Sequence, residues 1–356
     1  MKALNIYAGP SALKKLTQNG LRANDVRVIP AAAGGPKGLI LGPLDRFIFG
    51  NWLPTSQQEV HLIGASIGAW RMATACLDDA VSAFERLEYD YIHQNYELEP
   101  GRDFPTPAEI SLKFGESLKS FYSGRVAQAL QHSRYKLHIV TSRGRHMLRR
   151  ENKLATPLGY VGAFFTNAVR RKAMGVWLER VVFSVPDAAL PFRTQDYRTR
   201  QVHLNGDNFA PALQASCSIP FVLNAVHDIP GAPRGAYWDG GITDYHLHLD
   251  YNASDGIVLY PHFQKSVVPG WLDKSLKWRH GSTHFLDRMV VIAPKPEWIA
   301  RLPRAKLPDR NDFKHHGRDL AARIAQWTTC ASAAQELADE FATWLDKPDM
   351  AQVQAL

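Results

Sequence analysis

The sequence has few cysteines and no long apolar run. Its three cysteines, Cys76, Cys217 and Cys330, lie far apart among 356 residues, and their number is odd. This excludes a disulfide framework and a cysteine-rich metal site. No window approaches the roughly 18 to 20 uninterrupted apolar residues that a membrane-spanning helix needs. The first residues also lack the apolar core of a signal peptide, so we expect a cytoplasmic protein.

The sequence also lacks internal repeats, low-complexity tracts and long serine- or glycine-rich linkers. With 45% hydrophobic residues it can bury a substantial core, and we expect a single domain over residues 1–356. Basic residues outnumber acidic ones by 42 to 34, which gives a net charge of +8. Such a charge favours anionic partners in general, including phospholipid surfaces, acyl phosphates, nucleotides and nucleic acid, and selects none of them.

Short β-branched or apolar runs alternate with helical patterns in the first third of the chain. We expect a strand over 26–32 followed by a helix beginning near Pro36, and a strand over 59–65 followed by a helix over 67–77. This alternation is typical of βαβ units. It predicts an α/β fold with a mostly parallel central sheet flanked by helices on both faces.

Further helices and strands are expected along the rest of the chain. The expected helices cover about 80–97, 107–131, 208–221 and a C-terminal extension over 317–346, and the expected strands cover 135–142, 180–185, 257–263 and 289–294. Between them, residues 143–180 form a variable segment in which basic residues flank aromatic ones. This composition suits an interfacial helix or a lid over an apolar pocket. An ordinary surface helix with a core-facing stripe gives the same pattern.

A Gly-x-Ser-x-Gly pattern, centred on Ser66, marks the turn from the second strand into its helix. The small residues Gly64 and Gly68 permit a strained turn that lifts the Ser66 hydroxyl to the carboxyl end of the sheet, with Ile67 beginning the helix. A serine nucleophile needs a base, most often a histidine. Five downstream histidines are available by position, and no local pattern distinguishes them: His262, His280, His284, His315 and His316.

A glycine-rich turn follows the first strand, where the sequence reads AAAGGPKG. Gly34 and Gly35 allow a tight bend with exposed N–H groups, and Gly38 lies in the helix that follows. The helix N-terminus and Lys37 provide positive potential that can hold an oxyanion. A phosphate-binding loop is the alternative, although the standard glycine patterns of nucleotide sites are absent.

A third motif, YWDGG, places Asp239 at the end of a short aromatic strand. The two glycines after it permit close backbone approach and a reversal of the chain. A carboxylate held within hydrogen-bond reach of a serine can act directly as a general base. The alternative is an Asp-Gly turn with a purely structural role.

Together the three motifs resemble the patatin-like phospholipase family, which has a glycine-rich oxyanion loop with a basic residue, a Gly-x-Ser-x-Gly elbow and a distant Asp-Gly-Gly. A fourth segment, ALQASCSIPF at 212–221, is similar to a helix-to-strand segment of that family. The resemblance covers about residues 26–245, in a motif-bearing core of about 26–260. The chain departs from the family pattern at Ala33, where the family's loop has a glycine. It departs again in the residues that follow Gly241.

The resemblance implies a three-layer α/β/α fold and a Ser-Asp dyad. Ser66 would attack an acyl ester and Asp239 would act as the base, so no histidine is needed. Backbone N–H groups around Gly34 and Gly35 would hold the oxyanion, and Lys37 would contribute electrostatics. No metal and no other cofactor is implied.

We therefore expect a serine acyl hydrolase of lipase or phospholipase type that acts on an acyl-ester lipid. An esterase, thioesterase or polyester depolymerase on the same fold is an alternative. A non-catalytic lipid-binding module and an ordinary Ser-His-Asp hydrolase also remain open. The net charge and the segment 143–180 favour peripheral contact with an anionic membrane surface, and no nucleic acid partner is expected.

A last pattern alternates polar and apolar residues directly after the Asp-Gly-Gly motif. On a strand, Asp244, His246, His248 and Asp250 would share one face. A hydrogen-bonded polar face is the first interpretation, and a metal site or a substrate contact is the alternative. The cluster Lys314-His315-His316 is expected in an exposed loop.

Overall fold

The computed structural model describes residues 2–96, 101–102, 104–253 and 255–356. Its described part forms an 11-stranded mixed sheet in which most neighbouring strands are parallel. The strands are β1 (Leu4–Ala8), β2 (Val26–Ala31), β3 (Val60–Ala65), β4 (Tyr135–Gly144), β5 (Leu178–Ser184), β6 (Thr199–His203), β7 (Val226–His227), β8 (Ala236–Asp239), β9 (Ile257–Pro261), β10 (Met289–Pro294) and β11 (Val353–Ala355). They follow the order β11-β1-β10-β9-β2-β3-β4-β5-β6, with β8 paired to β4 and β7 paired to β8.

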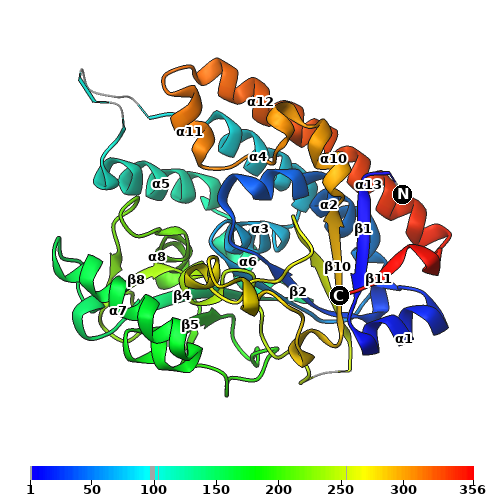
Figure 1. Cartoon of the computed structure of the whole chain (residues 1–356), viewed down its shortest axis with the longest axis horizontal. Helices are drawn as coiled ribbons and strands as arrows, with labels where there is room; N and C mark the ends of the chain where they lie inside the picture. Colours follow the sequence, from blue (N-terminus) through cyan, green and yellow to red (C-terminus); the bar gives the residue numbers. More distant parts are fainter. Residues whose placement is uncertain (1, 97–100, 103, 254) are drawn as a thin grey trace.

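Helices pack around this sheet (Figure 1). They are α1 (Pro10–Asn19), α2 (Gly42–Phe47), α3 (Ile67–Ala75), α4 (Ala80–His93), α5 (Pro107–Tyr122), α6 (Val126–Gln131), α7 (Ala155–Val169), α8 (Gly206–Cys217), α9 (Gly241–Asp244), α10 (Pro296–Arg301), α11 (Asn311–His316), α12 (Leu320–Ala333) and α13 (Gln335–Asp346). Helices α2, α3, α4, α12 and α13 form one connected layer, and α1 packs against β1, β10 and β11. The arrangement agrees with the expected three-layer α/β/α fold.

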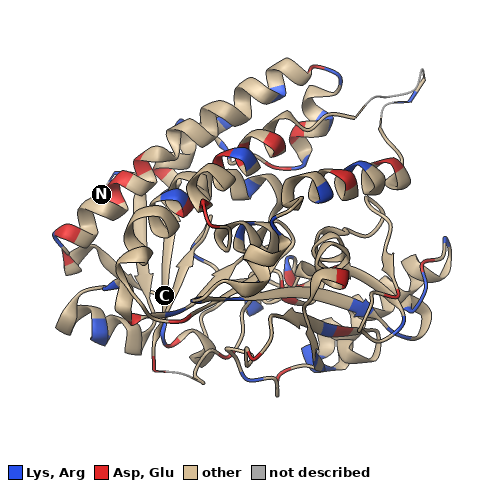
Figure 2. Cartoon of the chain, turned by 180° about the vertical axis from the view of Figure 1, so that it is seen from behind, with Lys and Arg blue, Asp and Glu red and all other residues tan. Residues whose placement is uncertain are grey.

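The central strands are buried because helices cover them. Every residue of β9 and β10 is buried, and both are runs of mostly apolar residues without polar alternation. Such runs are typical of parallel strands that are covered on both faces. Lys, Arg, Asp and Glu positions lie mainly on the outer helices and loops (Figure 2). No helix in the described ranges combines the length and the apolar character needed to cross a bilayer.

Two strands share one edge of β4 and meet end to end. β3 runs parallel to β4, and its last residue, Ala65, lies opposite Val140. β8 runs antiparallel to β4, and its last residue, Asp239, lies opposite Thr141. Because β5 occupies the other edge of β4 over this stretch, β3 and β8 end at the same point of the sheet.

The loop after β2 leaves the sheet at the same edge as the turn after β3. The two strands are parallel neighbours, with Ala31 opposite Gly64. The glycine-rich turn therefore begins beside the Gly-x-Ser-x-Gly turn. A short 3₁₀ helix, η2 (Gly35–Leu41), follows it and leads into α2, where the sequence predicts a helix from Pro36.

The six strands expected over 26–32, 59–65, 135–142, 180–185, 257–263 and 289–294 are confirmed as β2, β3, β4, β5, β9 and β10. Strands β1 and β11, at the two ends of the chain, were not expected. They pair with each other, and β1 also pairs with β10. The C-terminal part of the chain therefore completes the sheet beyond the motif-bearing core.

Several expected helices end earlier than their patterns suggest. α4 ends at His93, whereas the expected helix continued to residue 97, which lies outside the described residues. The helix expected over 107–131 is two helices, α5 and α6, because Gly124 between them has a φ of +69°. The helix expected up to Phe221 ends at Cys217.

The C-terminal helical extension also differs in detail. It begins at Leu320 and is divided at Ala334 into α12 and α13. The expectation of a loop at Lys314, His315 and His316 is wrong, because these residues form the last turn of α11, although Lys314 and His315 are exposed as expected. A ring nitrogen of His316 lies 2.7 Å from the Gln326 side-chain oxygen.

The segment after Gly241 does not form the expected strand. α9 is followed by turns, and Asp244, His246, His248 and Asp250 do not share one strand face. The carboxylate of Asp244 binds arginines, while both histidine rings contact backbone carbonyls. No group of metal-ligating side chains is present among the described residues.

A buried ion pair fixes this segment to the sheet. Arg180 of β5 and Asp244 of α9 are both fully buried. The Arg180 Nε and Nη2 atoms donate to the two Asp244 carboxylate oxygens at 2.7 and 2.6 Å. Arg180 also donates to both carboxylate oxygens of Asp196. The guanidinium charge is therefore compensated on two sides.

We expect Asp244→Ala to lower the free energy of unfolding by about 3–5 kcal/mol, because it leaves a buried arginine charge without its main partner. Urea denaturation of the purified variant measures this. Asp255→Ala is the matched control, since Asp255 pairs with Arg288 at the surface and such pairs contribute about 0–1 kcal/mol. Equal effects of the two substitutions would contradict the assignment.

Candidate active site

Ser66 occupies a strained turn between β3 and α3. Its φ is +58° and its ψ is −130°, a conformation that costs a non-glycine residue about 1–3 kcal/mol and is concentrated at functional sites. The flanking glycines are required by close packing. A Cβ atom on Gly64 would lie less than 3.0 Å from the Ala69 backbone, and one on Gly68 would lie less than 3.0 Å from the Ala31 carbonyl.

The Ser66 hydroxyl donates a hydrogen bond to Asp239. The distance from Oγ to Oδ2 is 2.6 Å, and 4% of Ser66 and 5% of Asp239 is exposed. The structure thus brings together the two residues that the sequence assigns to catalysis. A short hydrogen bond to a buried carboxylate is the geometry that a Ser-Asp dyad requires.

The downstream histidines have other partners. His262 contacts the Gln264 backbone, and His280 contacts the Asp273 carbonyl. Burial lowers the pKa of His262 to about 3. Within the described chain no histidine ring is hydrogen-bonded to Ser66, so the geometry favours the carboxylate as proton acceptor.

Besides the bond from Ser66, three hydrogen bonds hold the backbone and side chain of Asp239. Its N–H donates to the Ser218 carbonyl at 2.8 Å, and its carbonyl accepts from the Ser142 hydroxyl at 2.9 Å. The Gly241 N–H donates to Oδ1 at 2.7 Å. Burial raises the pKa of Asp239, while the hydrogen bond from Ser66 and the positive charge of Arg310 oppose that rise.

The segment 212–221 supplies a residue that links the two halves of the dyad. The hydroxyl of Ser216 on α8 accepts from the Ser66 N–H at 2.9 Å and donates to the Val140 carbonyl at 2.7 Å. Its carbonyl accepts from the Gly240 N–H at 3.1 Å. The sequence analysis assigned no role to this serine, although it lies in the fourth motif.

The two glycines after Asp239 are needed for tight packing. A Cβ on Gly240 would lie less than 3.0 Å from the Val140 carbonyl, and one on Gly241 would lie 2.6 Å from the Cβ of Ala33. Ala33 has no positive φ, so this position of the loop tolerates a side chain. Gly241 leaves the space that the Ala33 methyl group fills.

The glycine-rich loop borders the serine. Gly35 has a φ of +56° and lines a cavity together with Ser66 and Ile67, while Gly34 packs against the Phe263 ring. Among the described residues, the N–H groups of Gly34, Gly35 and Ile67 have no hydrogen-bond acceptor. A Cβ on Gly38 would lie 3.2 Å from Ile67, so the loop and α3 are in close contact.

Lys37 points away from the serine. Its Nζ lies 5.0 Å from the centroid of the Phe263 ring, and the residue is not part of the cavity lining. Burial lowers its pKa. Its charge lies over an aromatic face, and its electrostatic role at the loop stays a prediction.

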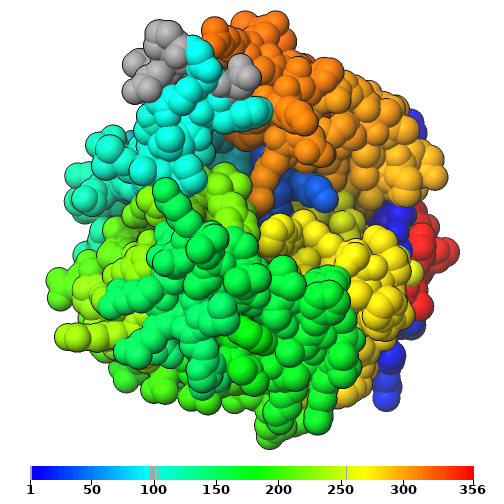
Figure 3. All heavy atoms as spheres, turned by 60° about the vertical axis from the view of Figure 1, so that its left-hand side comes forward, coloured from blue at the N-terminus to red at the C-terminus, as the bar shows by residue number. Residues whose placement is uncertain are grey.

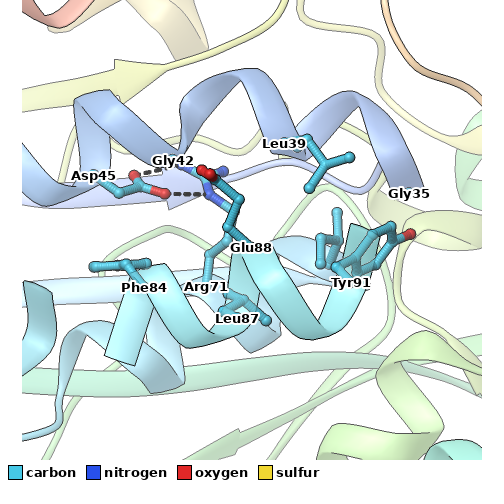
Figure 4. Close-up of a pocket in the computed structure, with 11 residues that line it drawn as sticks. Gly35, Leu39, Gly42, Asp45, Arg71, Phe84, Leu87, Glu88 and Tyr91 are labelled. Atoms are coloured by element: carbon cyan, nitrogen blue, oxygen red, sulfur yellow. Dashed lines mark hydrogen bonds and ion pairs between the residues drawn. The ribbon is translucent and has the colours of Figure 1, made fainter. Parts of the chain in front are cut away.

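A buried ion pair ties the loop to the nucleophile helix. Arg71 of α3 donates to both carboxylate oxygens of Asp45 on α2, at 2.6 and 2.7 Å (Figure 4). Both side chains are buried. Because α2 is joined to the glycine-rich loop by η2 and α3 follows Ser66 directly, this pair fixes the two turns relative to each other.

Ser66 opens into an apolar cavity of about 450 Å³. In Figure 3 a hollow lies between cyan, orange, yellow and green parts of the chain, with the blue N-terminal part at its floor. Aromatic and aliphatic side chains dominate its lining, among them Trp70, Ile110, Phe114, Phe221, Val222 and Phe313. Its size and apolar character are those of a small-molecule site.

Two cations that the sequence analysis missed lie beside the dyad. Lys274 and Arg310 line a small cavity of about 20 Å³ together with Asp239. Burial and the neighbouring charges of Arg310 and Lys37 lower the pKa of Lys274 to about 8. No local motif marks either residue, and both belong to the part of the chain beyond the motif-bearing core.

No protein-family model matches the chain, and no curated protein sequence matches it.

We expect Gly68→Ala to lower the free energy of unfolding by about 1–3 kcal/mol, because the added methyl group overlaps the Ala31 carbonyl. Thermal or urea unfolding of the variant measures this. Gly206→Ala is the matched control, since nothing lies within 4 Å of an added methyl group there. An equal change in the free energy of unfolding in both variants would show that the close contact at Gly68 does not constrain this position.

Proposed function

We propose that this protein is a serine acyl hydrolase that cleaves acyl esters with a Ser66–Asp239 dyad. The observation that carries the proposal is the 2.6 Å hydrogen bond from the Ser66 hydroxyl to the Asp239 carboxylate, at the wall of a large apolar cavity. A hydroxyl polarised in this way is poised for nucleophilic catalysis. The cavity offers room for the acyl chain of the substrate.

In the first step, the Ser66 oxygen attacks the ester carbonyl while its proton passes to Asp239. Gly35 and Ile67 line the same cavity, and their N–H groups, which have no acceptor among the described residues, would receive the developing oxyanion. The tetrahedral intermediate collapses as the C–O bond to the alcohol breaks. The proton on Asp239 then moves to the departing alkoxide, which leaves an acyl-enzyme and a free alcohol.

In the second step, water attacks the acyl-enzyme and gives its proton to Asp239. The new tetrahedral intermediate breaks its bond to Ser66, and the proton returns to the serine oxygen. The products are a carboxylic acid and the regenerated enzyme. Asp239 accepts and returns the proton in both steps, so the dyad needs no third residue. The same oxyanion-binding groups serve both steps.

The lining of the cavity supports a substrate with a lipid-like acyl group. Its apolar walls favour an extended hydrocarbon chain, because burying each methylene group contributes about 0.8 kcal/mol. Arg310 lines this cavity and also a small neighbouring cavity, where Lys274 lies next to Asp239. These two cations suit an ester whose alcohol part carries negative charge.

A fluorophosphonate probe tests the nucleophile. We expect it to label the wild-type protein and to leave Ser66→Ala unlabelled. Asp239→Asn should lower kcat for p-nitrophenyl acyl esters by about 10²–10⁴-fold, which is the usual contribution of a general base. Labelling is read on a gel and hydrolysis by absorbance.

Each variant must keep the wild-type thermal unfolding midpoint for this test to count. Full hydrolysis by Asp239→Asn, together with its loss in His262→Ala, would replace the dyad with a histidine mechanism. Labelling of Ser66→Ala would place the nucleophile elsewhere. Hydrolysis of neither long- nor short-chain esters by the wild type would reject the proposed activity.

The pH dependence tests the role of Arg310. Asp239 must be ionised to accept the proton, and the positive charge of Arg310 lowers its pKa. We therefore expect Arg310→Gln to shift the acidic limb of kcat/KM to higher pH, because the carboxylate then takes up a proton more readily. Stopped-time hydrolysis across a pH series measures the shift.

Arg301→Gln is the control for this pH profile, because it removes an exposed positive charge that pairs with Glu336 at the surface. Its acidic limb should coincide with that of the wild type. An unchanged limb in Arg310→Gln would show that the arginine charge does not act on Asp239.

A further inference from the structure

Helix α7 exposes an apolar stripe. Leu154, at its N-terminal boundary, begins a series of large apolar side chains that recur every three or four residues and lie on one side of a helix. Their exposed fractions range from 53% to 88%. The series is Leu154, Leu158, Val161, Phe165 and Val169, and we call it the α7 stripe.

The opposite face of α7 is packed against the protein. Tyr160 and Ala163 are buried in a cluster with Trp238, and Asn167 donates a hydrogen bond to Asp273 at 2.8 Å. Because the helix is anchored by this face, the α7 stripe cannot turn inward. α7 contains no charged residue, so its outward side is apolar along its whole length.

Cationic residues flank the α7 stripe at both ends. Glu151 is the only acidic residue between positions 149 and 172, against six basic ones. Four of the basic residues are exposed and form no ion pair within the described part of the chain: Arg149, Lys153, Arg170 and Lys172. An apolar band between exposed cations is complementary to an anionic phospholipid surface.

A tryptophan extends this surface beyond the end of α7. Trp278 is 72% exposed, and the next residue, Arg279, donates to the Ala168 carbonyl of α7 at 3.1 Å. Exposed tryptophans are enriched at the interface between membrane and water.

Helix α7 lies next to the mouth of the active-site cavity. Phe221 lines that cavity and is 56% exposed. Its ring packs edge-on against Tyr160 of α7, at 5.9 Å between centroids. Val222 is also exposed and lines the cavity. The buried face of α7 therefore packs against the rim of the cavity.

We propose that the α7 stripe and its flanking cations dock the protein on an anionic phospholipid bilayer. The stripe enters the headgroup region while Lys153 and Arg170 bind lipid phosphates. The cavity rim at Phe221 then lies beside the docked helix. The delivery of a lipid ester from the bilayer to Ser66 rests on the proposed function, whereas docking itself does not require catalysis.

Vesicle sedimentation with a Ser66→Ala background measures docking separately from hydrolysis. We expect binding to vesicles of phosphatidylcholine mixed with phosphatidylglycerol and weaker binding to phosphatidylcholine alone. Adding Leu158→Glu with Phe165→Glu should weaken the binding by roughly tenfold, because two charges enter the apolar band. Val169→Glu alone, at the helix end, is the milder variant if the double substitution impairs folding.

Charge and position are tested by two further variants. Lys153→Gln with Arg170→Gln should weaken binding to the anionic vesicles by roughly tenfold and leave binding to neutral vesicles unchanged. Tyr89→Glu is the matched control, since Tyr89 is 62% exposed on α4, which packs in another layer. It should bind like the parent protein.

Three outcomes overturn the docking proposal. The first is the absence of binding to anionic vesicles, and the second is a loss of binding in Tyr89→Glu equal to that in the stripe variants. The third is a dimer in light scattering that Phe165→Glu converts to a monomer, because a second copy of the chain would then cover the α7 stripe. Hydrolysis of a water-soluble short-chain ester by the protein with Ser66 intact, with and without the stripe variants, reports separately on the proposed activity. If the wild-type protein does not hydrolyse that ester, the proposed function is rejected, and the docking result is unaffected.

Discussion

The hydrogen bond between Ser66 and Asp239 depends on the way two strands share one edge of β4. β3 runs along β4 in one direction and β8 in the other, so their last residues meet at Val140 and Thr141. Every other contact of the site supports this junction. Ser216 binds the backbone on both sides of it, and the glycines around it leave room for neighbouring carbonyls.

The junction also explains why the charges near the dyad come from distant parts of the chain. The β3–β8 end of the sheet is open to the cavity, and the C-terminal part closes over it with Lys274 and Arg310. Their charges oppose the effect of burial on Asp239. Burial raises the pKa of Asp239, and the two cations limit that rise.

Local patterns predicted the parts of this structure that depend on neighbouring residues. Continuous apolar runs identified six central strands, and the glycine spacings identified the turns around Ser66 and Asp239. The patterns failed where tertiary contacts decide. The alternation of polar and apolar residues from Asp244 to Asp250 resembled a strand. Instead, Asp244 forms an ion pair with the buried Arg180, and the chain turns. Arg310 carried no local signal because only folding places it beside Asp239.

The end-to-end meeting of β3 and β8 has a consequence for biosynthesis. Ser66 and Asp239 are 173 positions apart, so a nascent chain displays its serine long before its carboxylate has been made. Until β8 pairs with β4, the Ser66 hydroxyl lacks its hydrogen-bond acceptor. The Ser66–Asp239 hydrogen bond is therefore formed only when the sheet closes, and its presence reports on the completion of folding.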